Sequence, residues 1–422
     1  MNARLSGILS GCVEPPPSKS QAHRLLICAA LGKELCSVAC SALNDDLVAT
    51  MNSLNSLGAK IIYREGSFIV QPIKVQKGGI LNCGESGSTL RFLISVAAVL
   101  GADATFVGEG KLPMRPNGDL RAALSSKGIT FEQHNPPLEL PLTCKGRLNG
   151  GKYIIPGNIS SQYLTGLLFA LPLALEDSKI EITGKLTSAS YIGMTLDAVH
   201  SAGIFIDCKE NIFHIPGKQQ YMLPKDVKVE GDWSAAAFWI VAGVTGKNPI
   251  TIQGMNLQSL QGDRAIITHL RKMGAFIEER EDSIIAMPSQ LFGAELDCMD
   301  TPDLVPILAV AAASAEGETL FTNVGRLRYK ESDRLAAMKT TLAAFDITSS
   351  IGEDTFTVYG GDIIAKEQVD SFGDHRIAMS AAILATLAKG ETTIKGAECV
   401  AKSYPHFFDD IKKLGANIIL DK

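Results

Sequence analysis

The chain has 422 residues, a formal net charge of −5 and 20% charged residues, a composition typical of a globular protein with two or three domains. The acidic balance argues against a nucleic-acid-binding surface, so a site for an anionic ligand must be local. The first residues lack the apolar core of a signal peptide, and no apolar stretch reaches the roughly 20 residues of a membrane span. We therefore expect a cytoplasmic protein.

Residues 15–24 read PPPSKSQAHR and precede the first strongly apolar stretch. The prolines prevent a helix from starting earlier, so Lys19 and Arg24 fall in the first turns of a nonpolar helix. One explanation is an anionic ligand at the helix N-terminus, where free N–H groups and the helix dipole favour negative charge. The alternative is that Ser20 caps the helix and the two cations face water.

Helices built from small apolar residues recur along the chain, each after a polar or glycine-rich start. Because they are apolar all round, we expect all of them to be buried. The six copies are SKSQAHRLLICAALG, SGSTLRFLISVAAVLG, SSQYLTGLLFALPLAL, GDWSAAAFWIVAGVTG, PDLVPILAVAAASAEG and GDHRIAMSAAILATLAKG.

A second pattern alternates with these helices: an amphipathic helix, a residue suited to the left-handed conformation, a strand, a polar turn and another strand. The residues that end the amphipathic helices are Gly58, Gly128, Gly203, Gly274, Asp346 and Gly415. The spacing indicates six repeats of about 70 residues. We predict two domains of three repeats each, formed by residues 17–229 and by residues 230–422 with residues 1–16. The N-terminal residues would supply strands to the last repeat.

Several cations lie beside helix starts, turns or apolar runs instead of on solvated faces. They are Lys19, Arg24, Arg91, Arg115, Lys330, Arg334, Arg376 and Lys402. Arginine binds phosphate or carboxylate through a bidentate fork, and lysine acts as a mobile point charge, so the set suits a ligand with several negative groups. Asp303 opens a buried helix, where an N-cap role is the alternative to a catalytic one.

Motifs for other chemistries are missing from the chain. It contains no phosphate-binding P-loop, dinucleotide fingerprint, zinc-protease helix or serine nucleophile elbow. The pattern therefore predicts that arginine and lysine side chains hold the phosphate groups, with no metal and no cofactor.

Eight motifs occur in an order that resembles the enolpyruvyl transferase family: SKSQAHR, GESGSTLRF, MRPNGDL, GNISSQYLTGLL, PDLVP, YKESDRL, GDHRIAM and AKSYPHF. The resemblance covers nearly the whole chain. It implies an α/β fold of two similar domains, each with three βαβαββ repeats in an inverse α/β barrel-like arrangement, and an active site in the interdomain cleft. It also implies transfer of the enolpyruvyl group of phosphoenolpyruvate to the 5-hydroxyl of shikimate 3-phosphate, a step towards chorismate and the aromatic amino acids.

The resemblance implies roles for individual residues. The residues expected to bind shikimate 3-phosphate are Lys19, Ser20, Arg24, Ser160, Ser161, Gln162, Ser188, Tyr191, Asp303 and Lys330. Those expected to bind phosphoenolpyruvate are Lys19, Gly87, Arg115, Gln162, Glu331, Arg334, Arg376 and Lys402.

The implied reaction is addition followed by elimination, which needs positioned acids and bases. Asp303 is expected to accept the proton of the attacking hydroxyl, with Glu331 as a possible partner. Glu331 is also expected to exchange a proton with the C3 methylene. Lys19 would assist proton transfer at the bridging oxygen, and His375 would orient neighbouring groups or relay protons. Which carboxylate protonates C3 stays open.

Two alternatives remain at this point: the sister enzyme that uses UDP-N-acetylglucosamine, and a non-catalytic phosphosugar-binding protein. The sister enzyme has Lys-Asn at the opening motif and a reactive cysteine before its loop arginine. Here Ser20 follows Lys19, and the loop GEGKLPMRP contains no cysteine. Gly87 implies room for the inhibitor glyphosate. Glu85 departs from the family pattern, and its effect on phosphoenolpyruvate and glyphosate affinity stays open. We expect a monomer.

Overall fold

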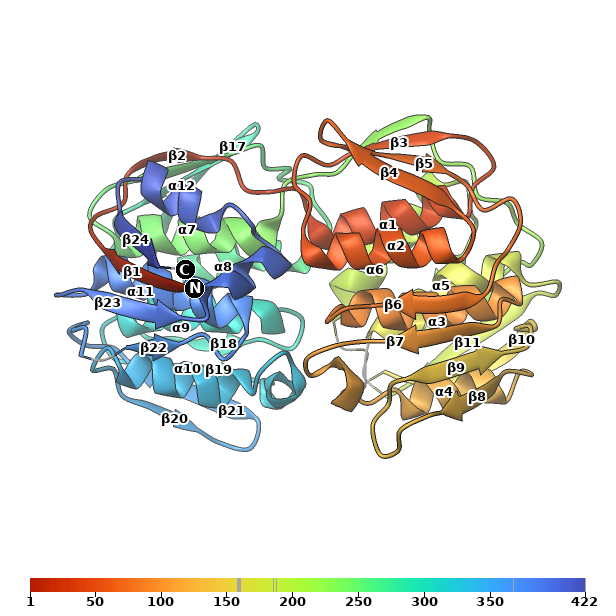
Figure 1. Ribbon diagram of the computed structural model, residues 1–422. Coiled ribbons are helices and arrows are strands. Elements are labelled where there is room, and N and C mark those ends of the chain that lie inside the picture. The colour runs from red at the N-terminus through yellow and green to blue at the C-terminus, as the bar shows by residue number, and fades with distance from the viewer. Residues whose placement is uncertain (158–160, 185, 187, 367, 422) are drawn as a thin grey trace. The chain divides into compact units, whose positions relative to one another are not determined.

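The computed structural model describes residues 1–157, 161–184, 186, 188–366 and 368–421 (Figure 1). The chain forms two compact units: the first domain, Lys19–Val229, and the second domain, Met1–Ser18 with Glu230–Lys422. Pro17 and Ser18 belong to the second domain because Pro17 pairs with Gly231 and the Ser18 N–H donates to the Glu230 carbonyl at 2.7 Å. The sequence-based boundary lies earlier, between residues 16 and 17.

The described residues form six four-stranded sheets that share one topology: a parallel outer pair followed by two antiparallel neighbours. In the first domain, the first sheet has the order β14 (Asp226–Lys228), β3 (Cys36–Ala39), β5 (Ser67–Gln71), β4 (Lys60–Arg64). The second has the order β6 (Gly79–Asn82), β7 (Ala104–Val107), β9 (Leu142–Lys145), β8 (Thr130–Gln133). The third has the order β10 (Gly151–Pro156), β11 (Ser178–Thr183), β13 (Ile212–Ile215), β12 (Asp207–Lys209).

The second domain repeats this topology in its own three sheets. One has the order β2 (Gly11–Val13), β15 (Ile250–Gln253), β17 (Ser283–Met287), β16 (Phe276–Arg280). The next has the order β18 (Glu295–Asp297), β19 (Glu318–Thr322), β21 (Thr355–Tyr359), β20 (Ser349–Ile351). The last has the order β22 (Val369–Asp370), β23 (Thr392–Lys395), β1 (Asn2–Ser6), β24 (Asn417–Asp421). The prediction that the N-terminus completes the last repeat is confirmed for β1, whereas β2 joins the fourth repeat.

The predicted apolar helices are buried, as their composition requires. They are α1 (Lys19–Ala30), α3 (Gly87–Leu100), α5 (Ser161–Ala170), α7 (Trp233–Thr245), α9 (Val305–Ala313) and α11 (His375–Leu387). In the second domain, α7, α9 and α11 pack on one another, and each also contacts strands of its own repeat's sheet. In the first domain α3 packs against α5. Within the described residues, no helix has both the length and the apolar character to cross a bilayer.

The amphipathic helices are each only partly buried. They are α2 (Asp45–Ser56), α4 (Gly118–Ser125), α6 (Ala189–Ser201), α8 (Ile266–Lys272), α10 (Arg334–Ala343) and α12 (Phe407–Lys413). The residue predicted to end each one has positive φ in every repeat, including the single non-glycine, Asp346, at +66°. Short 3₁₀ helices connect other elements: η1 (Leu112–Met114), η2 (Leu171–Leu173), η3 (Gly262–Ala265), η4 (Pro302–Leu304), η5 (Gly325–Tyr329) and η6 (Ala397–Lys402).

Candidate active site

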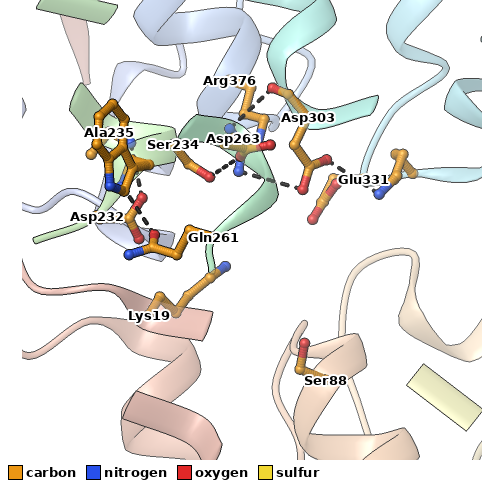
Figure 2. A network of polar contacts seen from close by, with 12 residues as sticks. Lys19, Ser88, Asp232, Ser234, Ala235, Gln261, Asp263, Asp303, Glu331 and Arg376 are labelled. Atoms are coloured by element: carbon orange, nitrogen blue, oxygen red, sulfur yellow. Dashed lines mark hydrogen bonds and ion pairs between the residues drawn. The ribbon is translucent and has the colours of Figure 1, made fainter. Parts of the chain in front are cut away.

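Charged side chains gather at the N-terminal ends of helices in the second domain (Figure 2). Arg334, the first residue of α10, is at the centre of this group, and its side chain is only 1% exposed. Its guanidinium contacts Asp303 Oδ1 at 2.7 Å, Glu331 Oε2 at 2.7 Å and Asp374 Oδ2 at 2.8 Å. A buried charge needs such partners because desolvation is costly. We call these residues, with Lys330 and Arg376, the carboxylate cluster.

Asp303 is the carboxylate with the most cationic neighbours. Besides Arg334, it contacts Lys330 Nζ at 3.2 Å and Arg376 Nη2 at 3.5 Å, and Arg376 Nη1 donates to its backbone carbonyl at 3.1 Å. Burial alone would raise the pKa of Asp303, but the three neighbouring cations hold the pKa well below its usual range. The carboxylate is therefore ionised at neutral pH.

The N-cap interpretation of Asp303 is wrong. Helix α9 begins at Val305, and the residue at its N-cap position is Leu304, which makes no side-chain cap. Asp303 lies one residue earlier, in η4, and directs its carboxylate to the cations instead.

Asp374 joins Arg334 to the start of α11. It is fully buried, accepts from the backbone N–H of Arg376 at 3.0 Å and accepts from the Ser332 hydroxyl at 3.0 Å. Burial would raise the pKa of Asp374, but Arg334 lowers it below its usual range. The next residue, His375, is 2% exposed and lies in the first turn of α11, beside the carboxylate cluster.

Lys402 contacts the backbone just before the same helix start. It ends η6, and its ammonium donates to the Gly373 carbonyl at 2.8 Å, one residue before Asp374. The structure thus brings together, within the second domain, all the predicted site residues of that domain: Asp303, Lys330, Glu331, Arg334, His375, Arg376 and Lys402.

A second group of cations lies within the first domain, at the start of α1. Lys19 Nζ contacts Asp46 Oδ2 at 2.8 Å. Arg24 is 2% exposed and donates to the Ser20 carbonyl at 2.6 Å, the Tyr191 carbonyl at 3.0 Å and the Thr195 hydroxyl at 3.0 Å. Ser20 lies inside α1, which begins at Lys19, so the interpretation of Ser20 as the N-cap is wrong.

Gly87 is the first residue of α3, and it lies against the guanidinium groups of two arginines, Arg115 and Arg91. A Cβ at Gly87 would lie 2.8 Å from Arg115 Nη1 and 3.2 Å from Arg91 Nη1. Arg91 in turn donates to Gln162 Oε1 at 2.6 Å and to Asn117 Oδ1 at 3.0 Å. We call Lys19, Arg24, Arg91 and Arg115, together with Gly87 and Gln162, the cation cluster.

The remaining predicted residues lie at the starts of α5 and α6. Ser161 begins α5, and Gln162 follows it, donating from Nε2 to Ser88 Oγ at 3.1 Å. Ser188 precedes α6 with φ of +57°, and the Tyr191 ring lies 5.9 Å from the Arg24 guanidinium carbon. Ser160 lies outside the described residues, so its predicted role stays a prediction.

The sequence did not predict the partners of three residues that the structure places in these clusters. Asp46 pairs with Lys19, Arg91 holds Gln162, and Asp374 holds Arg334. Asp374 had a readable signal, since an aspartate just before an apolar helix is a common cap. The partners of Asp46 and Arg91 are 27 and 71 residues away, so no local pattern reveals them.

Comparisons with known proteins agree on one family. A family profile described as EPSP synthase (3-phosphoshikimate 1-carboxyvinyltransferase) matches residues 4–411. The chain is 42% identical over 414 residues to a protein of Clostridium kluyveri named 3-phosphoshikimate 1-carboxyvinyltransferase, covering 97% of this chain and 96% of that protein. A protein of Clostridium acetobutylicum with the same name is also 42% identical, over 416 residues and with the same coverage.

Solved structures show the same fold at lower sequence identity. The EPSP synthase of Acinetobacter baumannii superposes with a TM-score of 0.84 at 23% identity, covering 99% of this chain and 100% of that one. The enolpyruvyl transferase NikO of Streptomyces tendae has a TM-score of 0.81 at 19% identity, covering 99% and 98%.

Proposed function

Because the chain belongs to the EPSP synthase family, we propose a division of labour between its two clusters during enolpyruvyl transfer. The enzyme transfers the enolpyruvyl group of phosphoenolpyruvate to the 5-hydroxyl of shikimate 3-phosphate. In the proposal, the cation cluster binds anionic groups of the substrates, and the carboxylate cluster moves protons while its cations bind phosphoenolpyruvate.

The observation that carries the proposal is the position of Asp303. One carboxylate contacts three cations and has a second carboxylate, Glu331, on the same arginine. A site that only bound anions would gain nothing from this buried negative charge, since it repels the ligand. Proton transfer, in contrast, needs a carboxylate fixed in place.

In the addition step, the 5-hydroxyl oxygen bonds to C2 of phosphoenolpyruvate, Asp303 accepts the hydroxyl proton, and C3 gains a proton from Glu331. In the elimination step, the tetrahedral intermediate loses phosphate from C2 and returns the proton from C3. Lys19 assists at the bridging oxygen. The cations near the leaving phosphate stabilise the charge that develops there.

Substrate binding also solves a difficulty that the geometry poses. A carboxylate held by three cations is a weak base, because each cation favours its ionised form. When Lys330 or Arg376 also contacts a substrate anion, that anion offsets part of the stabilisation that the cation gives to the Asp303 carboxylate. Asp303 then becomes a stronger base. The substrates thus activate the base by competing for its cations.

Within the cation cluster, Arg24 suits anion binding because the partners described for it carry no formal charge. The partners described for Arg24 are a hydroxyl and two backbone carbonyls, and these align a guanidinium without neutralising it. Arg115 lies against Gly87, where the missing side chain leaves the guanidinium room. We propose that Arg115 binds phosphoenolpyruvate, and that the same space admits glyphosate.

The test is phosphate release from the purified protein with phosphoenolpyruvate and either shikimate 3-phosphate or UDP-N-acetylglucosamine, with EDTA present. Release only with shikimate 3-phosphate supports the proposal and its independence of added metal. Release only with the UDP-sugar would overturn the acceptor, and tight binding without release would favour a non-catalytic phosphosugar-binding protein. Sedimentation and cell fractionation test the proposals that the enzyme is monomeric and cytoplasmic.

A further inference from the structure

One buried carboxylate next to the carboxylate cluster has no role in the mechanism above. Asp263 lies in η3 and is 3% exposed. Its Oδ2 accepts a hydrogen bond from the Ser234 hydroxyl at the start of α7, and no residue in the described part of the chain donates to its Oδ1. Burying a carboxylate with one unsatisfied oxygen is costly, so its presence calls for an explanation.

The surroundings of Asp263 are those of the proposed reaction centre. Figure 2 shows Asp263, Arg376 and Asp303 in the same part of the network, where Arg376 Nη2 contacts Asp303 Oδ2 at 3.5 Å. The charged groups acting on Asp263 are Arg376 from α11, Asp303 from η4 and Asp232 from the residue before α7. Burial raises the pKa of Asp263 to about 6, and Arg376 opposes that rise.

Arg376 therefore interacts electrostatically with two carboxylates, those of Asp263 and Asp303. Each carboxylate weakens the hold of Arg376 on the other, since like charges raise one another's proton affinity. A negative charge at Asp263 makes Asp303 a stronger base. The same charge makes Arg376 less attractive to an incoming anion.

We propose that Asp263 is a positioning residue that acts through Arg376: it raises the proton affinity of Asp303 for the attack of the hydroxyl and weakens the binding of phosphoenolpyruvate. Ser234 holds the Asp263 carboxylate in place for this task. The proposal rests on the function proposed above, in which Asp303 is the base and Arg376 binds phosphoenolpyruvate.

The variant Asp263→Asn tests the proposal, because asparagine keeps the size and the acceptor for Ser234 but removes the charge. We expect kcat to fall several-fold, because Asp303 is a weaker base without the neighbouring negative charge. We also expect the KM for phosphoenolpyruvate to fall about threefold, because the negative charge that opposes anion binding at Arg376 is removed. Structural damage moves KM the other way, so a fall in kcat with a rise in KM overturns the proposal, as do unchanged constants.

A control for net charge is Asp362→Asn, in the same domain. Asp362 is 78% exposed, pairs with Lys389 at 3.3 Å, and lines a pocket with Thr245 and Thr386 at the C-terminal ends of α7 and α11. This variant removes the same charge at the far end of these helices. Both constants should stay at the wild-type values, and the same changes in Asp362→Asn as in Asp263→Asn would overturn the proposal.

A second variant keeps the proposal testable if Asp263→Asn does not fold. Ser234→Ala leaves the carboxylate but removes its described hydrogen-bond donor, so Asp263 should ionise at a higher pH. The kcat of Ser234→Ala should be several-fold lower than that of the wild type near pH 6 and equal to it near pH 9. A deficit that does not change with pH overturns the proposal. Failure of the proposed function is distinguishable, since wild-type protein would then release no phosphate with shikimate 3-phosphate.

Discussion

In the second domain, the buried guanidinium of Arg334 contacts three carboxylates, whereas in the first domain the buried guanidinium of Arg24 contacts a hydroxyl and two backbone carbonyls. Both arginines are fixed by their partners, but only the first is neutralised. Neutral oxygens orient a cation and leave its charge for a ligand, while carboxylates consume that charge. The difference separates a cluster suited to binding anions from one suited to moving protons.

Loss of the central carboxylate is the most direct way to break this comparison. We expect Asp303→Asn to lower kcat by about 10²–10⁴ with little change in shikimate 3-phosphate binding, because the variant loses a base and keeps the cations. Steady-state kinetics and calorimetry measure the two effects. The control is Asp333→Asn, since Asp333 caps α10 and otherwise makes a 3.8 Å ion pair with the partly exposed Arg328, and asparagine caps equally well. Full turnover by Asp303→Asn would remove Asp303 from the mechanism.

Loss of the central cation should unfold the carboxylate cluster. Arg334→Met leaves the fully buried Asp374 without its guanidinium, and breaking a buried pair in this way costs about 3–5 kcal/mol. Urea unfolding measures the loss. Arg328→Met is the control, because Arg328 is 34% exposed and its ion pair to Asp333 spans 3.8 Å, so we expect a change below about 1 kcal/mol. Equal losses in both variants would contradict the view that Arg334 stabilises the fold by neutralising the carboxylates around it.

The pH dependence of stability tests whether Asp263, next to the carboxylate cluster, is a poorly neutralised carboxylate. Burial raises the pKa of this carboxyl from 3.8 to about 6, so between these values the folded state binds its proton more tightly than the unfolded state. The charge therefore destabilises the fold as pH rises through this window. Relative to wild type, Asp263→Asn should gain on the order of 2–3 kcal/mol between pH 4 and pH 7. Urea unfolding at both pH values tests this, and a constant difference would contradict it.

In the cation cluster, the geometry of the fork should matter more than the charge. Arg115→Lys keeps the charge but loses the bidentate fork, so we expect the KM for phosphoenolpyruvate to rise about tenfold at nearly unchanged kcat. Arg147→Lys, at an exposed position of the same domain, is the control and should change neither constant. A fall in kcat without a rise in KM would place Arg115 in the chemical step.

The smallest expected effect is at Gly87. A Cβ there would lie 2.8 Å from Arg115 Nη1, the mobile end of a long side chain, so the guanidinium must shift slightly. We expect Gly87→Ala to raise the KM for phosphoenolpyruvate about threefold and to weaken inhibition by glyphosate. Gly118→Ala is the matched control, because nothing lies within 4 Å of its Cβ. Wild-type turnover unaffected by high glyphosate would contradict the proposed inhibitor site.

Much of the fold follows from local sequence signals. The buried helices were predictable because they are apolar all round, and the ends of the amphipathic helices because the left-handed conformation favours glycine. The recurrence of both signals every 70 residues or so predicted the repeats. Membership of β2 in the fourth repeat was not predictable, because strand pairing between distant segments depends on the packed arrangement.

Three Gly-Asp pairs, at residues 231–232, 262–263 and 373–374, mark the limit of what the sequence by itself determines. Each lies at or just before the start of a helix or 3₁₀ turn and reads as a possible cap. In the structure Asp232 caps α7, Asp374 both caps α11 and holds Arg334, and Asp263 caps nothing but lies beside Arg376. Only the tertiary structure assigns these different roles, because a carboxylate's function depends on which distant charges the fold brings within reach of it.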